Sequence, residues 1–440
     1  MPLPDAPPLP PPLQSTALVA DIRTADAKTI ARWKADAGVH WWLELGDQLL
    51  LVGEHGELRA LVPEERVLGT RNDLDRDRLL LHGRGCVHDE ADPGLVLAQG
   101  GRWELRLLDD TDAIPTPESH EGVWQAVVPN TVLASRYRPT SLLGAANPLI
   151  LPVVQSVDAG RWFGDVETLA SWDRSSYGPE LAVSRVWIED RFADLGLAVS
   201  APPFTMPGAS GGNIVVNNVL GTWQGSTLPD EWIIVGGHYD SRNSNITSAT
   251  NTPGAEDNAS GCAGVIEAAR VLTAFRPKRS VLFMCYAGEE QGLYGSNAHV
   301  NSLLASGDLA RIQAVVIMDM IGYSAGSQLD VLLESNASWP AYLDRFAEAA
   351  SIYAPGMGVT TSTSACCSDH KPYLNAGKRS LLTIEKDWSI YPHYHQTTDF
   401  PVNLGIHAQA MGGAIIRMNV AVLAELSGAS DRIFADPFES

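Results

Sequence analysis

The second half of the chain contains three apolar runs, each long enough for a buried strand and each ending abruptly in polar residues: EWIIVGGHYDS, SVLFMCYAGEE and AVVIMDMIGY. Between the first two lies GCAGVIEAARVLTAF, and before the first lies SRVWIEDRFADLGL; both have apolar residues at helical spacing. Strands that alternate with helices are typical of a mainly parallel sheet covered on both faces. The sequence therefore predicts an α/β fold with a mainly parallel or mixed central sheet and helices on both faces.

The first part of the chain has a different texture. Short apolar runs (WWLEL, QLLLV, ELRALV, RLLLHG, LVLAQ and WELRLL) are separated by turn residues, which is typical of antiparallel strands. A short helix is expected at about 24–37. We expect a Pro-rich leader at 1–14, a small, mostly β domain at 15–125, a linker at 126–154, the α/β domain at 155–428 and a tail at 429–440. The first domain's dispersed histidines, His82, His88 and His120, are expected to be structural or exposed.

Composition excludes several classes of partner. The 440 residues carry a net charge of −21, which argues against nucleic acid and anionic membranes. Hydrophobic residues make up 45%, enough for a sizeable core, yet no apolar stretch reaches the roughly 20 residues that cross a bilayer. The first residues lack the basic start and apolar core of a signal peptide. Five cysteines is an odd number, so at least one has no partner within the chain.

Potential metal ligands stand where the three apolar runs end. His238 and Asp240 end the first run, Glu289 and Glu290 the second, and Asp319 the third. Sites in such sheets form where the carboxyl ends of the strands meet. Two further clusters are Glu256-Asp257-Asn258, just before a predicted helix, and a late segment from Tyr391 to Asp399 that contains His393 and His395.

Each cluster has a simpler explanation when taken alone. His238 and Asp240 could form a surface pair, and Glu289 and Glu290 could be solvated. Asp257 could be no more than the N-cap of a helix. Asp319 resists such an explanation, because a carboxylate after Val-Val-Ile-Met is costly to bury unless it is paired or metal-bound. The joint occurrence of the clusters favours a shared metal site.

The types of ligand point to the metal. Histidines and carboxylates without cysteine suit zinc in a hydrolytic site, whereas structural zinc favours thiolates. Five protein ligands exceed what one catalytic zinc uses and fit two ions roughly 3.5–4 Å apart that share a carboxylate. We therefore expect two Zn²⁺ per chain.

The ordered motifs GGHYDS, PGAEDNASG, AGEEQGLYGS, IMDMIGY and HQTTD resemble those of the secreted di-zinc aminopeptidases of the leucyl-aminopeptidase type, which are related to glutamate carboxypeptidases and glutaminyl cyclases. The resemblance covers about 155–428 and does not extend to 1–150. It implies a metallo-aminopeptidase with peptide or protein N-termini as substrates. A metallocarboxypeptidase of the same fold, a glutaminyl cyclase and a non-catalytic relative are the alternatives.

The resemblance also implies a role for each matching residue. His238 and Asp319 hold one zinc, Glu290 and His395 hold the other, and Asp257 bridges the two. His395 is preferred over His393 because it has the family's His-x-x-x-Asp spacing. Two catalytic roles follow: Glu289 is the general base for a bridging water, and Asp240 orients His238.

Less specific matches concern the substrate pocket, for which the resemblance gives Tyr323, Cys366, Cys367, Asp369 and His370. Cys262 and Cys285 are expected to be buried thiols. The adjacent pair Cys366 and Cys367 departs from relatives with two spaced cysteines, and free thiols are expected there rather than a strained disulfide. The first domain is expected to be an intramolecular inhibitor or an interaction module. A secreted or periplasmic location is favoured by the resemblance, and a cytoplasmic one by the amino terminus.

Overall fold

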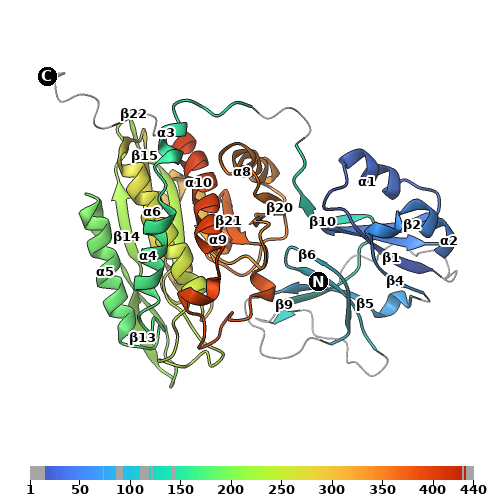
Figure 1. The fold of residues 1–440 in the computed structure, drawn as a ribbon. Helices are drawn as coiled ribbons and strands as arrows, with labels where there is room; N and C mark the ends of the chain where they lie inside the picture. Colours follow the sequence, from blue (N-terminus) through green and yellow to red (C-terminus); the bar gives the residue numbers. More distant parts are fainter. Residues whose placement is uncertain are drawn as a thin grey trace. The chain divides into compact units, whose positions relative to one another are not determined.

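The computed structural model describes residues 15–72, 74–85, 93–109, 118–119, 122–139, 144–428 and 431–432. The chain divides into two compact units, Met1–Arg138 and Pro139–Ser440. Figure 1 draws the first unit in blue to teal and the second in green to red. The predicted leader, His88, His120 and most of the predicted tail lie outside the described residues.

The first unit contains two sheets. One has the order β10-β2-β3-β1-β4 and the other β6-β7-β5-β9-β8. The strands are β1 (Thr16–Asp21), β2 (Val39–Gly46), β3 (Gln48–Gly53), β4 (Val67–Arg71), β5 (Leu79–Arg84), β6 (Leu95–Gly100), β7 (Trp103–Leu107), β8 (Glu118–Ser119), β9 (Gly122–Ala126) and β10 (Thr131–Arg136). Among its described residues the unit also has two short α-helices, α1 (Ala27–Lys34) and α2 (His55–Leu61).

Strand β3 shows how this unit is layered. Successive side chains of a strand point to opposite faces. Leu50 and Val52 belong to the core between the two sheets, whereas Leu49 and Leu51 belong to the core beneath the helices. Both faces are buried, and for this reason the run QLLLV is apolar throughout rather than alternating. The small, mostly β domain is thus present as predicted.

Two segments, one in the first unit and one that crosses into the second, differ from the sequence prediction. The run ELRALV was expected to be a strand, but the chain forms α2 there, and the two buried side chains of the run, Leu58 and Val62, are four residues apart. That is the spacing of one face of a helix, and Glu, Leu, Arg and Ala are all strong helix formers. The segment 126–154 was expected to be a linker, yet it contains β10, which pairs in parallel with β2, and α3 (Leu151–Gln155).

The second unit is built on a mixed sheet with the strand order β11-β14-β17-β15-β18-β21-β19-β20. The strands β17, β15, β18 and β21 run parallel in the middle. The bounds of the strands are β11 (Ala198–Ser200), β14 (Val219–Trp223), β15 (Leu228–His238), β17 (Arg279–Tyr286), β18 (Ile312–Met318), β19 (Asp330–Glu334), β20 (Gly358–Ser362) and β21 (Ser380–Glu385). Two small pairs lie outside the sheet: β12 (Pro203–Pro207) with β13 (Asn213–Asn217), and β16 (Phe275–Arg276) with β22 (Asp431–Arg432).

Helices cover both faces of this sheet, as the sequence predicted (Figure 1). Helices α4 (Ala159–Leu169), α5 (Glu180–Asp194), α6 (Gly261–Thr273), α8 (Pro340–Tyr353) and α10 (Ala408–Ser427) pack on one side, and α7 (Tyr294–Ser306) and α9 (His370–Asn375) on the other. By length and composition α10 is apolar enough to cross a membrane, but 83% of its most apolar stretch is buried within the unit. Such burial is expected of a central core helix.

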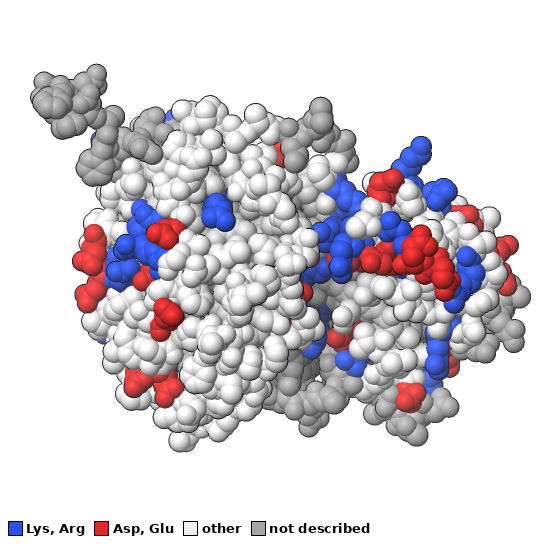
Figure 2. Space-filling view, in the orientation of Figure 1, with Lys and Arg blue, Asp and Glu red and all other residues white. Residues whose placement is uncertain are grey.

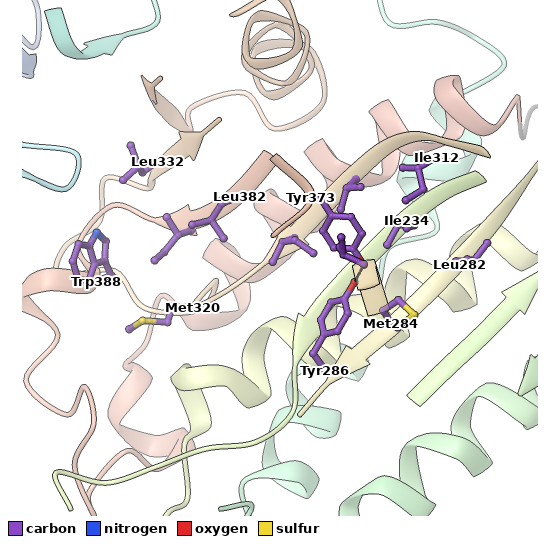
Figure 3. Packing of buried hydrophobic residues seen from close by; sticks show 14 of the residues in the cluster. Ile234, Leu282, Met284, Tyr286, Ile312, Met320, Leu332, Tyr373, Leu382 and Trp388 are labelled. Atoms are coloured by element: carbon purple, nitrogen blue, oxygen red, sulfur yellow. Dashed lines mark hydrogen bonds between the residues drawn. The ribbon is translucent and has the colours of Figure 1, made fainter. Parts of the chain in front are cut away.

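The core under α7 and α9 is drawn in Figure 3. Ile234 of β15, Leu282 of β17 and Leu382 of β21 belong to it. Tyr286 and Tyr373 point toward each other within it, and their hydroxyl oxygens are 2.7 Å apart. The core holds the central strands in register, so that their carboxyl ends lie side by side.

The surface of the second unit carries mixed charge. On the face that Figure 2 shows, acidic and basic side chains of the described residues lie interspersed among uncharged ones.

Candidate metal centre

Strand β15 places the first histidine. Gly237 precedes His238, and a Cβ there would lie 2.7 Å from the main-chain oxygen of Met318, so the close approach of β15 to β18 requires glycine. His238 is buried, with Nδ1 lying 3.0 Å from the main-chain oxygen of Asp240 and 3.5 Å from its Oδ1. Both neighbours are acceptors, so they favour a proton on Nδ1 and leave Nε2 able to bind a metal.

Asp257 lies in the irregular turn between Ala255 and Ser260, just before α6. Its Oδ1 atom is 3.2 Å from Nε2 of His238, and its Oδ2 atom is 2.9 Å from Nε2 of His395. The two oxygens therefore face two different histidines. The carboxylate has the arrangement expected of a ligand shared by two ions.

The end of β17 supplies two glutamates. Gly288 has a φ of +67°, which turns the chain sharply after the strand. Glu289 Oε2 lies 3.9 Å from Nε2 of His238, and Glu290 Oε2 lies 3.2 Å from Nε2 of His395. Adjacent residues thus serve the two halves of the site, and both side chains are buried.

The end of β18 supplies Asp319. Its Oδ1 atom is 3.4 Å from Nε2 of His238, and its Oδ2 atom accepts a hydrogen bond of 2.7 Å from Ser368 Oγ. His395 comes from the loop after β21 and has a left-handed backbone conformation, with a φ of 54°.

These side chains form two groups that could each hold a cation. His238, Asp257 and Asp319 make one, and Asp257, Glu290 and His395 make the other; within each group the ligand atoms lie within 4.8 Å of one another. Two ligands about 2.0–2.1 Å from a tetrahedral zinc are about 3.3 Å apart. The distances given above, between 2.9 and 3.4 Å, agree with that spacing.

Two further observations fit bound cations. Glu290 Oε1 is buried and has no hydrogen-bond partner among the described residues. Burial opposes protonation of His395, yet the carboxylates of Glu290 and Asp257 raise its pKa to about 9. Burial, with Asp257 nearby, raises the pKa of Glu290 to about 7. The carboxylates thus require compensating positive charge, which a divalent cation supplies while displacing protons.

The residues predicted for the substrate pocket differ in how far they are exposed. Tyr323 is half-buried and its ring lies 4.6 Å from that of Tyr391. Asp369 and His370, by contrast, are completely buried and add no accessible surface to a pocket. Asp369 directly precedes α9, and His370 is its first residue.

The cysteines give one agreement and one correction. Cys262 and Cys285 are buried free thiols, as predicted. Cys366 and Cys367, expected to be two free thiols, are joined by a disulfide.

Sequence reasoning missed Ser176. Its hydroxyl donates to Asp240 Oδ2 at 3.0 Å and accepts the Gly288 N–H at 3.1 Å, so it joins the ends of β15 and β17. It lies in a turn before the first motif, where nothing in the local pattern indicates a metal site.

Residues 218–417 match the family model described as Peptidase family M28. The matched residues are thus similar to the peptidases of this family, and they make up less than half of the chain. The matched segment contains all five predicted metal ligands and Glu289.

Known proteins similar to this chain include a probable zinc metalloprotease of Pyrenophora teres f. teres, which is 33% identical over 176 residues, or 40% of this chain and 36% of that protein. A leucine aminopeptidase 1 of Phaeosphaeria nodorum is 27% identical over 372 residues, which cover 78% of this chain and 91% of that one. The fold resembles the solved structure of a zinc aminopeptidase from Bacillus subtilis, with a TM-score of 0.53 and 17% identity over 63% of this chain and 98% of that one. This structural likeness concerns the fold alone.

The chain spans between 35% and 46% of the length of six curated zinc metalloproteases that it matches. What it shares with them is therefore a part of each protein rather than the whole.

Proposed function

We propose that this chain is a zinc-dependent metallo-aminopeptidase that hydrolyses the N-terminal residue from peptides, with two zinc ions per chain. The observation that carries the proposal is the position of Asp257, which turns one oxygen toward His238 and the other toward His395. The match to the family model and the likeness to a leucine aminopeptidase support the choice of an exopeptidase.

The five ligands divide between the two ions. His238 and Asp319 would hold one, Glu290 and His395 the other, and Asp257 both. Ions held there supply Lewis-acid polarisation of a water molecule and of the scissile carbonyl.

Glu289 is the general base in this proposal. It is not needed as a ligand, and its carboxylate faces the His238 half of the site at 3.9 Å. It takes the proton of the attacking water and delivers it to the leaving amine. Asp240 keeps the Nδ1 proton of His238 in place through its main-chain oxygen, and its carboxylate contributes a longer contact at 3.5 Å.

Restriction to the amino terminus requires a partner for the α-ammonium group of the substrate. The free α-amine of the substrate would coordinate one of the zinc ions or meet a nearby carboxylate, and either contact would restrict cleavage to the N-terminal residue.

A substrate panel tests the direction of cleavage. The proposal predicts hydrolysis of leucine p-nitroanilide and of other aminoacyl p-nitroanilides. Release of a C-terminal glutamate without p-nitroanilide hydrolysis would instead identify a metallocarboxypeptidase. Cyclisation of an N-terminal glutamine would identify a glutaminyl cyclase, and a zinc-loaded protein without any turnover a non-catalytic relative.

The role of the first unit and the location of the protein remain predictions. A chain that begins at Pro139 would show a large rise in activity if the first unit is an intramolecular inhibitor, and unchanged activity if it is an interaction module. A secreted or periplasmic location is tested by cell fractionation of the producing organism.

A further inference from the structure

Arg174 lies just after α4 and is completely buried, with an exposed fraction of 0%. Each of its hydrogen bonds goes to a main-chain carbonyl oxygen. Nε donates to Tyr239 at 2.8 Å, Nη1 to Leu169 at 2.5 Å and to Pro253 at 2.7 Å, and Nη2 to Gly254 at 2.7 Å. Burying a guanidinium is costly without such satisfaction, so the surrounding backbone is arranged around it.

Three of the four acceptors of Arg174 belong to the two segments that carry neighbouring metal ligands. Tyr239 directly follows His238, and Gly254 lies three residues before Asp257. The space is tight, because a Cβ on Gly254 would lie 2.3 Å from the main-chain oxygen of Asp257. One planar cation therefore ties the end of β15 to the turn that presents Asp257.

Asp399 holds the same turn from another direction. Its Oδ2 atom accepts the N–H of Asp257 at 3.1 Å, and Oδ1 accepts the N–H of Glu256 at 3.0 Å. Tyr391 donates its hydroxyl to Oδ1 at 2.7 Å, and the main-chain oxygen of Asp399 accepts the N–H of Ala255 at 2.9 Å. The carboxylate is buried and lies four residues after His395.

We propose that Arg174 and Asp399 are positioning residues that hold the turn of Asp257 from its carbonyl side and its amide side. Arg174 sets Asp257 Oδ1 against His238, and Asp399 sets Asp257 Oδ2 against His395. This inference rests on the proposed function, because the two halves of the site are taken to be two zinc sites. Loss of either residue weakens mainly the ion on its own side.

The effects of Arg174 and Asp399 can be separated in variants that keep only one of the two candidate zinc sites. In His395→Ala the site of His238, Asp257 and Asp319 remains, and in His238→Ala the site of Asp257, Glu290 and His395 remains. Arg174→Lys keeps the charge but loses the planar fork, and Asp399→Asn turns one acceptor into a donor. Zinc dissociation constants are measured with chelators of graded affinity, and the visible spectrum of the cobalt-substituted protein reports the ligand geometry.

Two control variants match the chemistry away from the site. Arg379 donates two hydrogen bonds to the main-chain oxygen of Gln313, at the opposite end of β18 from Asp319. Asp158 accepts the N–H groups of Gly160 and Arg161 at the start of α4. Arg379→Lys and Asp158→Asn are expected to change zinc affinity less than twofold.

The expected result is a loss of about 10–100-fold in zinc affinity. We expect Arg174→Lys to cause this loss in the His395→Ala background. We expect Asp399→Asn to cause it in the His238→Ala background. Unchanged affinities in folded variants would overturn the inference. The inference would also be overturned if the loss of zinc affinity were simply proportional to the loss of thermal stability of the metal-free variants. Arg174→Gln is the second variant if Arg174→Lys does not fold. A wild-type chain that binds no zinc would instead refute the proposed function.

Discussion

The Oδ2 atom of Asp257 lies 2.9 Å from Nε2 of His395, on the other side of the carboxylate from the oxygen that faces His238. The first prediction concerns a variant in which the two oxygens of this side chain are no longer equivalent. Asp257→Asn places an amide nitrogen toward one histidine, so this half of the site loses a negatively charged ligand. Elemental analysis after dialysis is expected to find one zinc or none per chain. Asp158→Asn is the control, and two zinc ions retained by Asp257→Asn would count against a shared ligand.

Glu289→Gln separates metal binding from catalysis. The amide keeps nearly the same size but cannot accept the proton of the attacking water. The variant is expected to hold both zinc ions and to lose on the order of 10²–10⁴-fold in turnover. The measurement is kcat for leucine p-nitroanilide at known zinc content. Wild-type turnover by a fully metal-loaded variant would sink the role given to Glu289.

Ser368→Ala tests a neighbour of a ligand. The hydroxyl of Ser368 donates to Oδ2 of Asp319 at 2.7 Å and so orients Oδ1 toward His238. Its loss is expected to weaken zinc binding about tenfold.

The matched control for Ser368→Ala is Ser335→Ala. This serine is also buried and donates at 2.7 Å, but to the main-chain oxygen of Ser380. Chelator competition measures both variants, and equal effects would remove the special role of Ser368.

His299 predicts a pH dependence of stability away from the metal site. Its Nδ1 lies 2.5 Å from the hydroxyl of Tyr373, and burial lowers its pKa from 6.5 to about 4. Between these values the unfolded chain binds a proton that the folded chain does not. The contribution of the neutral His299 to folding stability is therefore fully present above pH 6.5 and is lost as the pH drops toward 4.

The experiment compares wild type with His299→Gln in chelator at pH 7.5 and pH 4.5. The free energy of unfolding of the wild type is expected to fall by roughly 1–3 kcal/mol more than that of the variant. Parallel losses in the two proteins would show that His299 does not titrate in this window.

Much of the candidate metal site could be predicted because it depends on a local rule. His238, Glu290 and Asp319 each follow a buried run, and the carboxyl ends of parallel strands meet at one edge of a sheet. That register places His238, Glu290 and Asp319 near one another, whereas Asp257 comes from the irregular turn before α6, outside the sheet.

The residues that support the site could not be found in this way. Arg174 and Ser176 act through main-chain groups that are distant in sequence, and no spacing or composition marks such contacts. The helix α2 was missed for a different reason: the run ELRALV has only two buried side chains, Leu58 and Val62, and so short a pattern does not separate helix from strand.

The disulfide between Cys366 and Cys367 was also mispredicted, since adjacency alone does not decide whether two thiols are bonded. The inference of an aminopeptidase, by contrast, depends on resemblance to known proteins more than on any single residue.

The most direct test is a zinc titration of the chelator-stripped full chain while the hydrolysis of leucine p-nitroanilide is followed. We expect no hydrolysis without metal and a rate that reaches its maximum at two equivalents of zinc per chain. A maximum at one equivalent, or no hydrolysis at any zinc concentration, would contradict it.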